Sequence, residues 1–458
     1  MRIAAGEVYG YASNMSNAST IFALSSAPGR AGVAVIRISG REASDVLKKM
    51  VAPVPEPRIA AFRTIRHPET GEALDRAVVL WFAAPLSETG EDVVEFQVHG
   101  SRAVVAALLS ALATLPHCRL AEPGEFARRA FENGKLDLAE VEGLADLVDA
   151  ETEAQRRQAL AQAGGALSKL YEGWRTRLIE IAALTEAAID FSDEGDVSAS
   201  SFAEARKRAK TLHKEIAAHL DDGRRGEILR DGFRVALLGA PNAGKSSLLN
   251  ALARRDAAIV SAEAGTTRDV IEVRLDLAGL PVIVSDTAGI REAASEIEQE
   301  GIRRSLAAAR DADLILWLAE KAEKGESIPP LGFSRETSLV IRTKSDLPHE
   351  SQKGPEPGDL AISAKTGAGL DQLIGVIAER AGQAVGSQTD PAITQARHRQ
   401  ALETAQGDIQ TFLAGNMDTI ELRAEDVRRA AQALGRITGR VDVEDVLDQI
   451  FSRFCIGK

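Results

Sequence analysis

The chain has 458 residues, a formal net charge of −12 and two cysteines, and 45% of its residues are hydrophobic. This length allows two or three domains with sizeable cores. Cys118 and Cys455 are too few for a disulfide framework, which favours a reducing, cytoplasmic setting. The acidic balance argues against broad nucleic-acid binding through Lys and Arg. No apolar run approaches the roughly 18 residues of a membrane-spanning helix, so we expect no membrane anchoring.

The amino-terminal region begins without the apolar core of a signal peptide, and we expect residues 1–19 to be a disordered leader or a misassigned start. Residues 20–134 alternate short runs of strand type with turns, as in VAVIRISG (33–40), AVVLWF (77–82) and DVVEFQVHG (92–100). The stretch 101–115 has the spacing of an amphipathic helix. We therefore predict an α/β or α+β domain here.

The pattern of apolar residues changes twice in the rest of the chain. Apolar residues recur at helical spacing in 135–228, where Gly and Pro are rare, and again in 385–458. Between them, residues 229–384 alternate helical stretches with runs such as FRVALLG and PVIVSD, which are typical of buried parallel strands. The sequence thus predicts a multidomain α/β plus all-α protein. An α+β domain (20–134) precedes a helical domain (135–228 and 385–458), which is interrupted by an inserted domain (229–384) with a parallel sheet and helices on both faces.

The inserted domain opens with a phosphate-binding pattern. GAPNAGKS (239–246) matches G-x-x-x-x-G-K-[ST] in full, between an apolar run and a helical stretch. Gly239 and Gly244 let backbone N–H groups wrap phosphates. Lys245 brings a positive charge to the β- and γ-phosphates, and the Ser246 hydroxyl can coordinate Mg²⁺. We therefore predict a nucleoside triphosphate site.

Three later motifs indicate guanine as the base: DTAG (286–289), TKSD (343–346) and SAK (363–365). Asp286 can hold the Mg²⁺ shell, and the Gly289 N–H can sense the γ-phosphate. The Asp346 carboxylate can accept hydrogen bonds from guanine N1–H and the 2-amino group, a pattern that adenine does not offer.

The set resembles the translation-factor-like GTPases, which are P-loop proteins of Ras-like fold. These usually carry Asn at the position of Thr343, so the chain departs from the family pattern there, and Asp346 is expected to keep the main discrimination for guanine.

The hydrolytic machinery is less obvious. AGTTRD (264–269) lies between the phosphate loop and DTAG, and Thr267 is the expected switch I ligand of Mg²⁺. Many GTPases place a water-orienting Gln directly after DTAG, but here Ile290 follows. Either an arginine supplied by another molecule or a bound monovalent cation, held by Asn242 and oxygens from Ser261 to Thr266, could neutralise the developing charge.

The motifs GAPNAGKS, AGTTRD and DTAGIRE, together with the ending FCIGK, resemble the MnmE (TrmE) family of tRNA modification GTPases over nearly the whole chain, from about Ile21 to Lys458. The resemblance implies a folate-binding amino-terminal domain that forms a homodimer. It also implies that the chain works with MnmG, a partner that uses FAD and NADH. Together they add an aminomethyl or carboxymethylaminomethyl group to C5 of the wobble uridine (U34) of certain tRNAs. The one-carbon unit comes from 5,10-methylenetetrahydrofolate, a tetrahydrofolate derivative, and GTP hydrolysis depends on K⁺.

The resemblance also implies roles for individual residues. Ser246 and Thr267 are expected to bind Mg²⁺, and Glu298 to orient the attacking water. The expected K⁺ ligands are Asn242, Ser261, Glu263 and Thr266. The expected folate-binding residues are Arg37, Glu95, Lys135 and Lys458. The residues expected to bind GTP are Asn242, Ala243, Gly244, Lys245, Ser246, Ser247, Ser261, Ala262, Glu263, Ala264, Gly265, Thr266, Thr267, Asp286, Thr287, Ala288, Gly289, Thr343, Lys344, Asp346, Ser363, Ala364 and Lys365.

Cys455, four residues from the end, has three interpretations. In the family reading it is a nucleophile or proton donor near the folate site. A prenylation signal fits poorly, because Gly457 and Lys458 occupy its last two positions. A small apolar residue that completes the stripe from Val443 to Phe454 is the third. The segment PGEFARRAF (123–131) also matches a family signature, but its role is open.

Two other functions compete with the family reading. One is a GTPase switch in ribosome assembly, which would need neither residues 20–134 nor the FCIGK ending and usually carries basic extensions. The other is a folate-dependent methyltransferase with a vestigial GTPase, which the intact Lys245, Ser246, Asp286 and Asp346 argue against.

Overall fold

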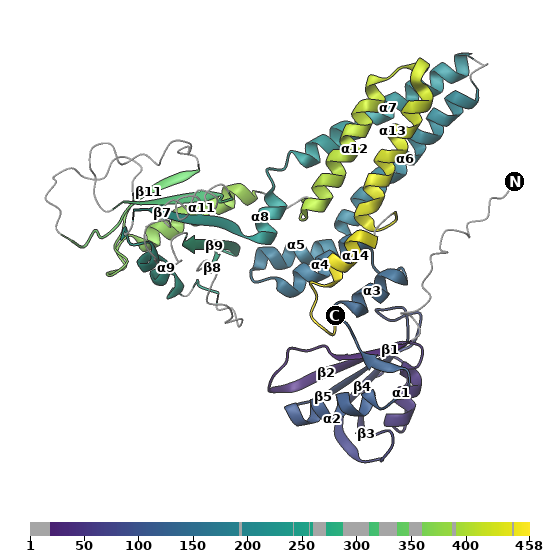
Figure 1. Ribbon diagram of the computed structural model, residues 1–458, viewed down its shortest axis with the longest axis vertical. Helices are drawn as coiled ribbons and strands as arrows, with labels where there is room; N and C mark the ends of the chain where they lie inside the picture. The colour runs from purple at the N-terminus through teal and green to yellow at the C-terminus, as the bar shows by residue number, and fades with distance from the viewer. Residues whose placement is uncertain are drawn as a thin grey trace, which may run out of the picture. The chain divides into compact units, whose positions relative to one another are not determined.

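The computed structural model describes residues 19–191, 195–240, 242–255, 257–259, 272–286, 311–319, 337–347, 360–386, 391–441 and 444–458 (Figure 1). The expected leader therefore lies outside the described residues, apart from Ser19. The chain divides into two compact units: Met1–Ala145 with Thr438–Lys458, and Asp146–Ile437. None of the described helices is long and apolar enough to span a membrane.

The first unit is built on a six-stranded sheet of order β3-β4-β5-β2-β1-β6, in which only the β1–β6 pair is parallel. Its strands are β1 (Thr20–Leu24), β2 (Ala31–Ser39), β3 (Ala61–Arg66), β4 (Ala73–Phe82), β5 (Val93–Gly100) and β6 (Cys118–Leu120). Alternate residues of β2, such as Ile36 and Ile38, are buried, because successive side chains of a strand point to opposite faces.

Helices cover this sheet and connect its strands. They are α1 (Ala43–Met50), α2 (Arg102–Ala113) and α3 (Glu125–Glu132), followed by α4 (Leu138–Asp149). Ser101 caps α2, since its hydroxyl accepts a hydrogen bond from the Val104 N–H at 3.2 Å. The last helix of the chain, α14 (Glu444–Phe451), also belongs to the first unit. Its Ile450 and Phe451 form a buried cluster with Leu138 and Val141 of α4.

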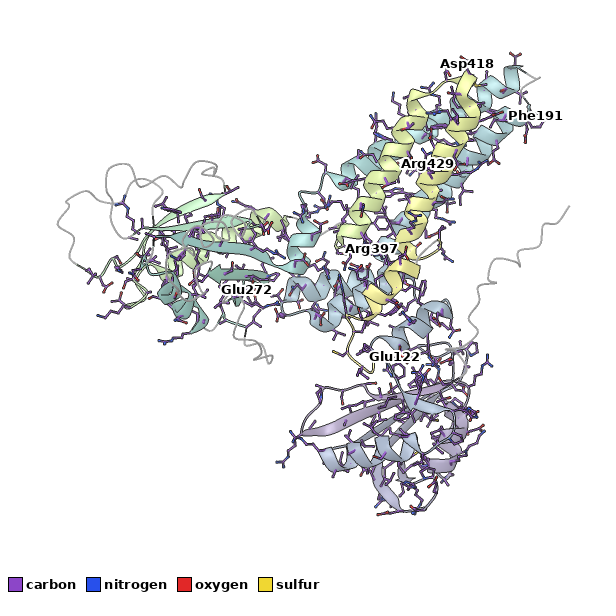
Figure 2. All side chains as sticks on the ribbon, in the orientation of Figure 1. Glu122, Phe191, Glu272, Arg397, Asp418 and Arg429 are labelled. Carbon is purple, nitrogen blue, oxygen red and sulfur yellow. The ribbon has the colours of Figure 1, made fainter. Side chains whose placement is uncertain are left out.

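The second unit contains a bundle of four long helices: α6 (Ala166–Asp190), α7 (Gly195–Leu220), α12 (Ala396–Ala414) and α13 (Ile420–Thr438), with the short 3₁₀ helix η1 (Met417–Thr419) between the last two. Their side chains form one core that combines residues 167–216 with residues 393–437. Figure 2 labels Arg429 of α13, which donates to Asp408 of α12 at 2.9 Å. Helices from both sides of the insertion thus form one bundle, as predicted.

The inserted α/β part carries a second six-stranded sheet, of order β12-β11-β10-β7-β9-β8. All of its pairs are parallel except β8–β9. The strands are β7 (Phe233–Gly239), β8 (Glu272–Leu277), β9 (Leu280–Asp286), β10 (Leu314–Ala319), β11 (Ser338–Arg342) and β12 (Leu360–Ala361). The parallel strands β7 and β10 are mostly apolar and buried, as expected for strands covered on both faces.

The described residues of the second unit also include four shorter helices: α5 (Glu153–Ala163), α8 (Arg225–Asp231), α9 (Lys245–Ala253) and α11 (Leu370–Val385). Leucines of α9 and α11, among them Leu248 and Leu373, share a core with Val235 and Leu237 of β7. This packing fixes the start of α9 at the carboxyl end of β7, where the phosphate-loop motif lies. The predicted arrangement of a helical domain interrupted by a P-loop domain is confirmed.

Candidate functional site

The phosphate-loop motif turns sharply between β7 and α9. Gly239 ends the strand at φ 149° and lies so close to β10 that an added Cβ would be 2.3 Å from the Leu318 carbonyl oxygen. Gly244 caps α9 at φ 95°. Both positions therefore require glycine, one for close approach and one for a left-handed backbone. The turn directs the amino terminus of α9, with its unpaired N–H groups, toward the loop.

Lys245 is held at the centre of this loop. Its ammonium group donates to the backbone carbonyls of Gly239 at 2.8 Å and Ala240 at 3.0 Å, and the residue is only 9% exposed. Burial lowers the pKa of Lys245, and the charge of Asp286 opposes that shift. A buried cation next to a helix amino terminus is suited to an anion such as phosphate.

Ser246 and Asp286 come together beside Lys245. The Ser246 hydroxyl donates to Asp286 Oδ2 at 2.8 Å, and Asp286 is buried at the end of β9, in register with Leu237 of β7. A hydroxyl and a carboxylate oxygen at this spacing fit the oxygen ligation and water shell of Mg²⁺. Within the described part of the chain there is no cluster of three or more His, Cys, Asp or Glu side chains suited to a metal.

The base-side motifs contact one another. Ser363 donates to Asp346 Oδ1 at 2.7 Å, and this hydrogen bond lowers the pKa of the exposed Asp346 carboxyl. Lys344, two residues before Asp346, adopts a left-handed backbone at φ 58°. The residues Ala364 and Lys365 follow Ser363 in the short turn before α11. The arrangement holds an ionised carboxylate in place, as recognition of a guanine edge requires.

Thr343 has a different position from the one its motif suggests. It is buried, and its hydroxyl donates to the carbonyl of Ala243 in the phosphate loop at 2.8 Å. The neighbouring loop residues Asn242 and Ser247 are exposed, with Asn242 at φ 62°. Thr343 therefore ties the base-side motif to the phosphate loop, and sequence reasoning missed this contact. The only signal for it was the departure from the usual Asn.

The remaining predicted residues of this site lie outside the described residues. They are Ser261, Ala262, Glu263, Ala264, Gly265, Thr266 and Thr267 of the AGTTRD region, Thr287, Ala288 and Gly289 of DTAG, and Glu298.

In the first unit, Arg37 of β2 and Glu95 of β5 face each other in register. Arg37 Nε donates to Glu95 Oε1 at 3.0 Å, and its other nitrogens lie 2.9 Å from Glu95 Oε1 and from a Glu88 carboxylate oxygen. The guanidinium also lies over the Phe126 ring, 5.8 Å from its centroid. Two of the four expected folate residues are thus brought together as an ion pair, while Lys135 is exposed and Lys458 is partly buried.

A buried ion network lies beside this pair. Arg129 is 3% exposed and contacts Glu91 and Glu125, each at 3.0 Å, while Arg119 also pairs with Glu125. Burial raises the pKa of Glu125, but hydrogen bonds from Arg119, the Glu122 N–H and Arg129 lower it by more. The segment PGEFARRAF supplies Glu125 and Arg129 to this network. The sequence did not assign a role to the segment, and the structure shows that it forms these ion pairs.

Cys455 lies in the tail that follows α14. It is exposed, whereas Phe454 before it and Gly457 after it are buried. The predicted stripe of Val446, Leu447, Ile450, Phe451 and Phe454 packs on α3 and α4, with Val443 outside the described residues. The cysteine itself does not complete this cluster. Its exposure does not support the interpretation of Cys455 as a packing residue.

Comparison with known proteins addresses the family. A family model described as the MnmE helical domain matches residues 138–455, and one described as the GTP-binding protein TrmE N-terminus matches residues 20–135. The chain is 55% identical over 443 residues to the tRNA modification GTPase MnmE of Parvibaculum lavamentivorans, which covers 96% of this chain and 100% of that protein. It is 51% identical over 445 residues to the protein of that name from Methylobacterium radiotolerans, covering 97% and 100%.

Among solved structures, the chain is similar to the G domain of the T. maritima FeoB iron transporter, with 23% identity, a TM-score of 0.23, and coverage of 33% of this chain and 98% of that one. The family models and the full-length relatives are decisive. The chain belongs to the MnmE family of tRNA modification GTPases.

Proposed function

We propose that this GTPase of tRNA modification is K⁺-dependent and acts with MnmG, which uses FAD and NADH. Together they add an aminomethyl or carboxymethylaminomethyl group to C5 of the wobble uridine of certain tRNAs. The one-carbon unit is supplied by 5,10-methylenetetrahydrofolate, and GTP hydrolysis drives a domain rearrangement. The observation that carries this proposal is the exposed Cys455 thiol. It follows the buried Phe454 and belongs to the same unit as the Arg37–Glu95 pair.

The nucleotide half of the proposal rests on the phosphate loop. The Lys245 ammonium group donates to two backbone carbonyls. It can exchange these contacts for hydrogen bonds to the β- and γ-phosphate oxygens. Ser246, with Thr267, supplies hydroxyl ligands to Mg²⁺, and Asp286 holds its water shell. Mg²⁺ held by these residues would neutralise charge that develops on the phosphates. Gly244 and Ser247 provide backbone N–H groups around the same anion, while the Ala243 N–H donates to the Ala240 carbonyl at 3.1 Å and shapes the loop.

The proposed recognition of guanine rests on Asp346. Its carboxylate, oriented by Ser363, accepts from guanine N1–H and from the 2-amino group. Lys344, Ala364 and Lys365 belong to the same two loops and complete the base pocket. Thr343 contributes through the phosphate loop, since its hydroxyl donates to Ala243.

The hydrolytic step is proposed to use a cation and a carboxylate of this chain. Asn242 is exposed in the phosphate loop and offers an amide oxygen, and Ser261, the Glu263 carbonyl and Thr266 add neutral oxygens suited to K⁺. A cation there stabilises the charge that an arginine supplied by a partner would otherwise stabilise. Glu298 orients the attacking water.

The proposed binding of folate and transfer of the one-carbon unit rest on residues of the first unit. Both Arg37 contacts to Glu95 use the same oxygen, Oε1, so Oε2 can accept from pterin N–H donors. Lys135 and Lys458 provide cations for the glutamyl carboxylates. Cys455 acts as nucleophile or proton donor during transfer. This donor set fits a folate: a carboxylate for the ring and cations for the acidic tail.

The larger organisation is part of the same proposal. The amino-terminal domain (20–134) forms a cytoplasmic homodimer, the helical domain (135–228 and 385–458) carries the GTPase domain (229–384), and the complex acts on tRNA. The GTPase domains of the two protomers pair when K⁺ and GTP bind.

The test is nucleoside mass spectrometry of tRNA from cells depleted of this protein and complemented with single variants. Loss of C5-modified wobble uridines on depletion is expected, with no rescue by Lys245→Ala, Glu298→Gln or Cys455→Ser. GTP hydrolysis by the purified Cys455→Ser protein should stay within about twofold of wild type, because Cys455 has no role in phosphate chemistry. Unchanged wobble uridines on depletion would overturn the proposal, and ribosome assembly profiles would then test the competing function.

The cation assignment has its own test. Hydrolysis in KCl should exceed that in NaCl at equal ionic strength by tenfold or more, about 1.4 kcal/mol of transition-state stabilisation. Asn242→Ala should remove this difference. Equal rates of the wild-type protein in the two salts would exclude K⁺ dependence.

A further inference from the structure

We propose that residues 123–128 of the PGEFARRAF signature are the docking site of the carboxyl-terminal tail (residues 452–458), and that Gly124 and Gly457 are positioning residues for Cys455. The inference rests on the proposed role of Cys455. It assigns a purpose to a segment that neither the GTPase motifs nor the expected folate residues use. All of the residues concerned belong to the first unit.

The tail is anchored on both sides of its cysteine. Phe454 is 6% exposed and joins the α3–α4 cluster, and Gly457 is buried. Cys455 and Ile456 between them are exposed. The Lys458 N–H donates to the Cys455 carbonyl at 3.3 Å and closes a turn around the two. The tail therefore presents its thiol from a fixed loop.

Backbone contacts tie the tail to the docking segment. Pro123 and Ile456 form an isolated antiparallel β-bridge. Gly124 has φ 68°, and an added Cβ would lie 2.4 Å from the Phe451 carbonyl oxygen at the end of α14. Since that oxygen belongs to the backbone, any side chain at position 124 would push the start of the tail away.

The far end of the tail makes a similar close approach. Gly457 has φ 104°, and an added Cβ would lie 2.4 Å from the Leu24 carbonyl oxygen. Leu24 ends β1 and pairs with Ile36 of β2, the neighbour of Arg37. The two glycines thus clamp the tail between the docking segment and the strand next to Arg37.

Side chains of the segment strengthen the clamp and link it to the Arg37–Glu95 pair. The Arg128 guanidinium lies over the Phe451 ring, 5.2 Å from its centroid, and pairs with Asp448 of α14. Phe126, two residues earlier, lies under Arg37. The segment therefore touches α14 through one side chain and the Arg37–Glu95 pair through another.

The segment itself is rigidly held. The Glu125 carboxylate accepts hydrogen bonds from Arg119, from Arg129 and from the backbone N–H of Glu122. Figure 2 labels Glu122. A site residue is positioned well only when its support is fixed by packing and hydrogen bonds. The buried ions of the signature supply that support for the tail.

The test places a trifluoromethyl label on Cys455 of the full-length protein, in a Cys118→Ser background. We expect one ¹⁹F resonance, displaced from that of a labelled peptide of residues 452–458. Gly124→Ala should move it toward the peptide position, because the added Cβ would overlap the Phe451 carbonyl oxygen, and the docked population should fall tenfold or more. The matched control is Gly71→Ala, which has the same backbone strain at φ 73° but nothing within 4 Å of an added Cβ, and it should leave the resonance in place.

Two further variants keep the test decisive. If Gly124→Ala does not fold, Gly457→Ala and Arg128→Gln should each move the resonance toward the peptide position. A label that stays at the docked position in these variants would overturn the docking assignment. Unlabelled Gly124→Ala protein, with Cys118 and Cys455 intact, should hydrolyse GTP normally and fail to restore wobble-uridine modification in depleted cells. Restored modification with an undocked tail would overturn the positioning role. If Cys455→Ser restores modification, the proposed role of the cysteine fails, whereas the resonance still reports docking.

Discussion

The Thr343 hydroxyl donates a buried hydrogen bond of 2.8 Å to the backbone carbonyl of Ala243, so the first residue of TKSD holds the phosphate loop, while Asp346 of the same motif contacts Ser363 of SAK. The Thr343 side chain also lies close to Gly244, at 3.7 Å from an added Cβ. The base-side and phosphate-side loops are therefore one connected structure. A substitution in the base-side loop should therefore alter nucleotide binding by the phosphate loop, and the reverse.

Thr343→Val tests this connection, because it removes the hydroxyl and keeps the shape. A neutral hydrogen bond contributes about 1 kcal/mol, and the unsatisfied Ala243 carbonyl adds to that, so we expect the KM for GTP to rise roughly fivefold to thirtyfold. Steady-state hydrolysis measures it. Thr343→Ser retains the hydroxyl and should stay close to wild type; an equal loss in both variants would contradict the hydrogen-bond explanation.

Asp346→Asn should change the base that is bound. Xanthine carries a carbonyl where guanine has the 2-amino group, and an amide can donate to it, whereas the carboxylate accepts from guanine. Two lost hydrogen bonds to a charged group at about 1.5–3 kcal/mol each predict a loss of GTP affinity of a hundredfold or more, with a gain for XTP. Competition binding of GTP and XTP measures the switch. Asp346→Ala should lose both nucleotides, and tight GTP binding by the Asn variant would disprove the assignment.

Arg129→Met should strongly destabilise the first unit. The guanidinium is 3% exposed and satisfies Glu91, Glu125 and the Ser19 carbonyl. Removing one partner of a buried ion network leaves uncompensated charge, which costs about 3–5 kcal/mol. Urea unfolding measures the free energy. Arg119→Met is the comparison: its side chain is 38% exposed, so a clearly smaller loss is expected. Equal losses would mean that burial does not set the cost.

His219 predicts the pH dependence of the helical bundle. It packs against Tyr171 and Trp174, and burial lowers its pKa from 6.5 to about 4, with Asp222 opposing and Arg225, Arg399 and His398 adding to the shift. The unfolded chain therefore binds the proton more readily. Stability should fall as the pH drops from about 7 to 5, by roughly 2 kcal/mol from this group.

The measurement is urea unfolding of the second unit at pH 7 and pH 5. His219→Gln has no group to protonate, so its stability should change less between the two pH values than that of the wild-type protein. A variant that keeps the full pH dependence would assign the effect to another residue.

The sequence alone was enough for the arrangement of the folds. Period-two burial in β2, the apolar runs of β7 and β9 and the helical spacing on both sides of the insertion all follow from local patterns, and the structure confirms them. The phosphate loop was equally readable, because one continuous strand–loop–helix segment carries Gly239, Gly244, Lys245 and Ser246. Such features depend on residues close in the chain.

Only the tertiary structure decided the contacts between distant segments. Ala243 and Thr343 are 100 residues apart, and Pro123 lies more than 300 residues before Ile456. No spacing rule links such positions, since pairing between them depends on how whole elements pack. The exposure of Cys455 belongs to the same class: α14 ends in the buried Phe451, and Phe454 joins the same cluster, but the apolar stripe does not show that the next side chain faces solvent. Local sequence thus determined which chemical groups this protein carries, and long-range packing determined which of them meet.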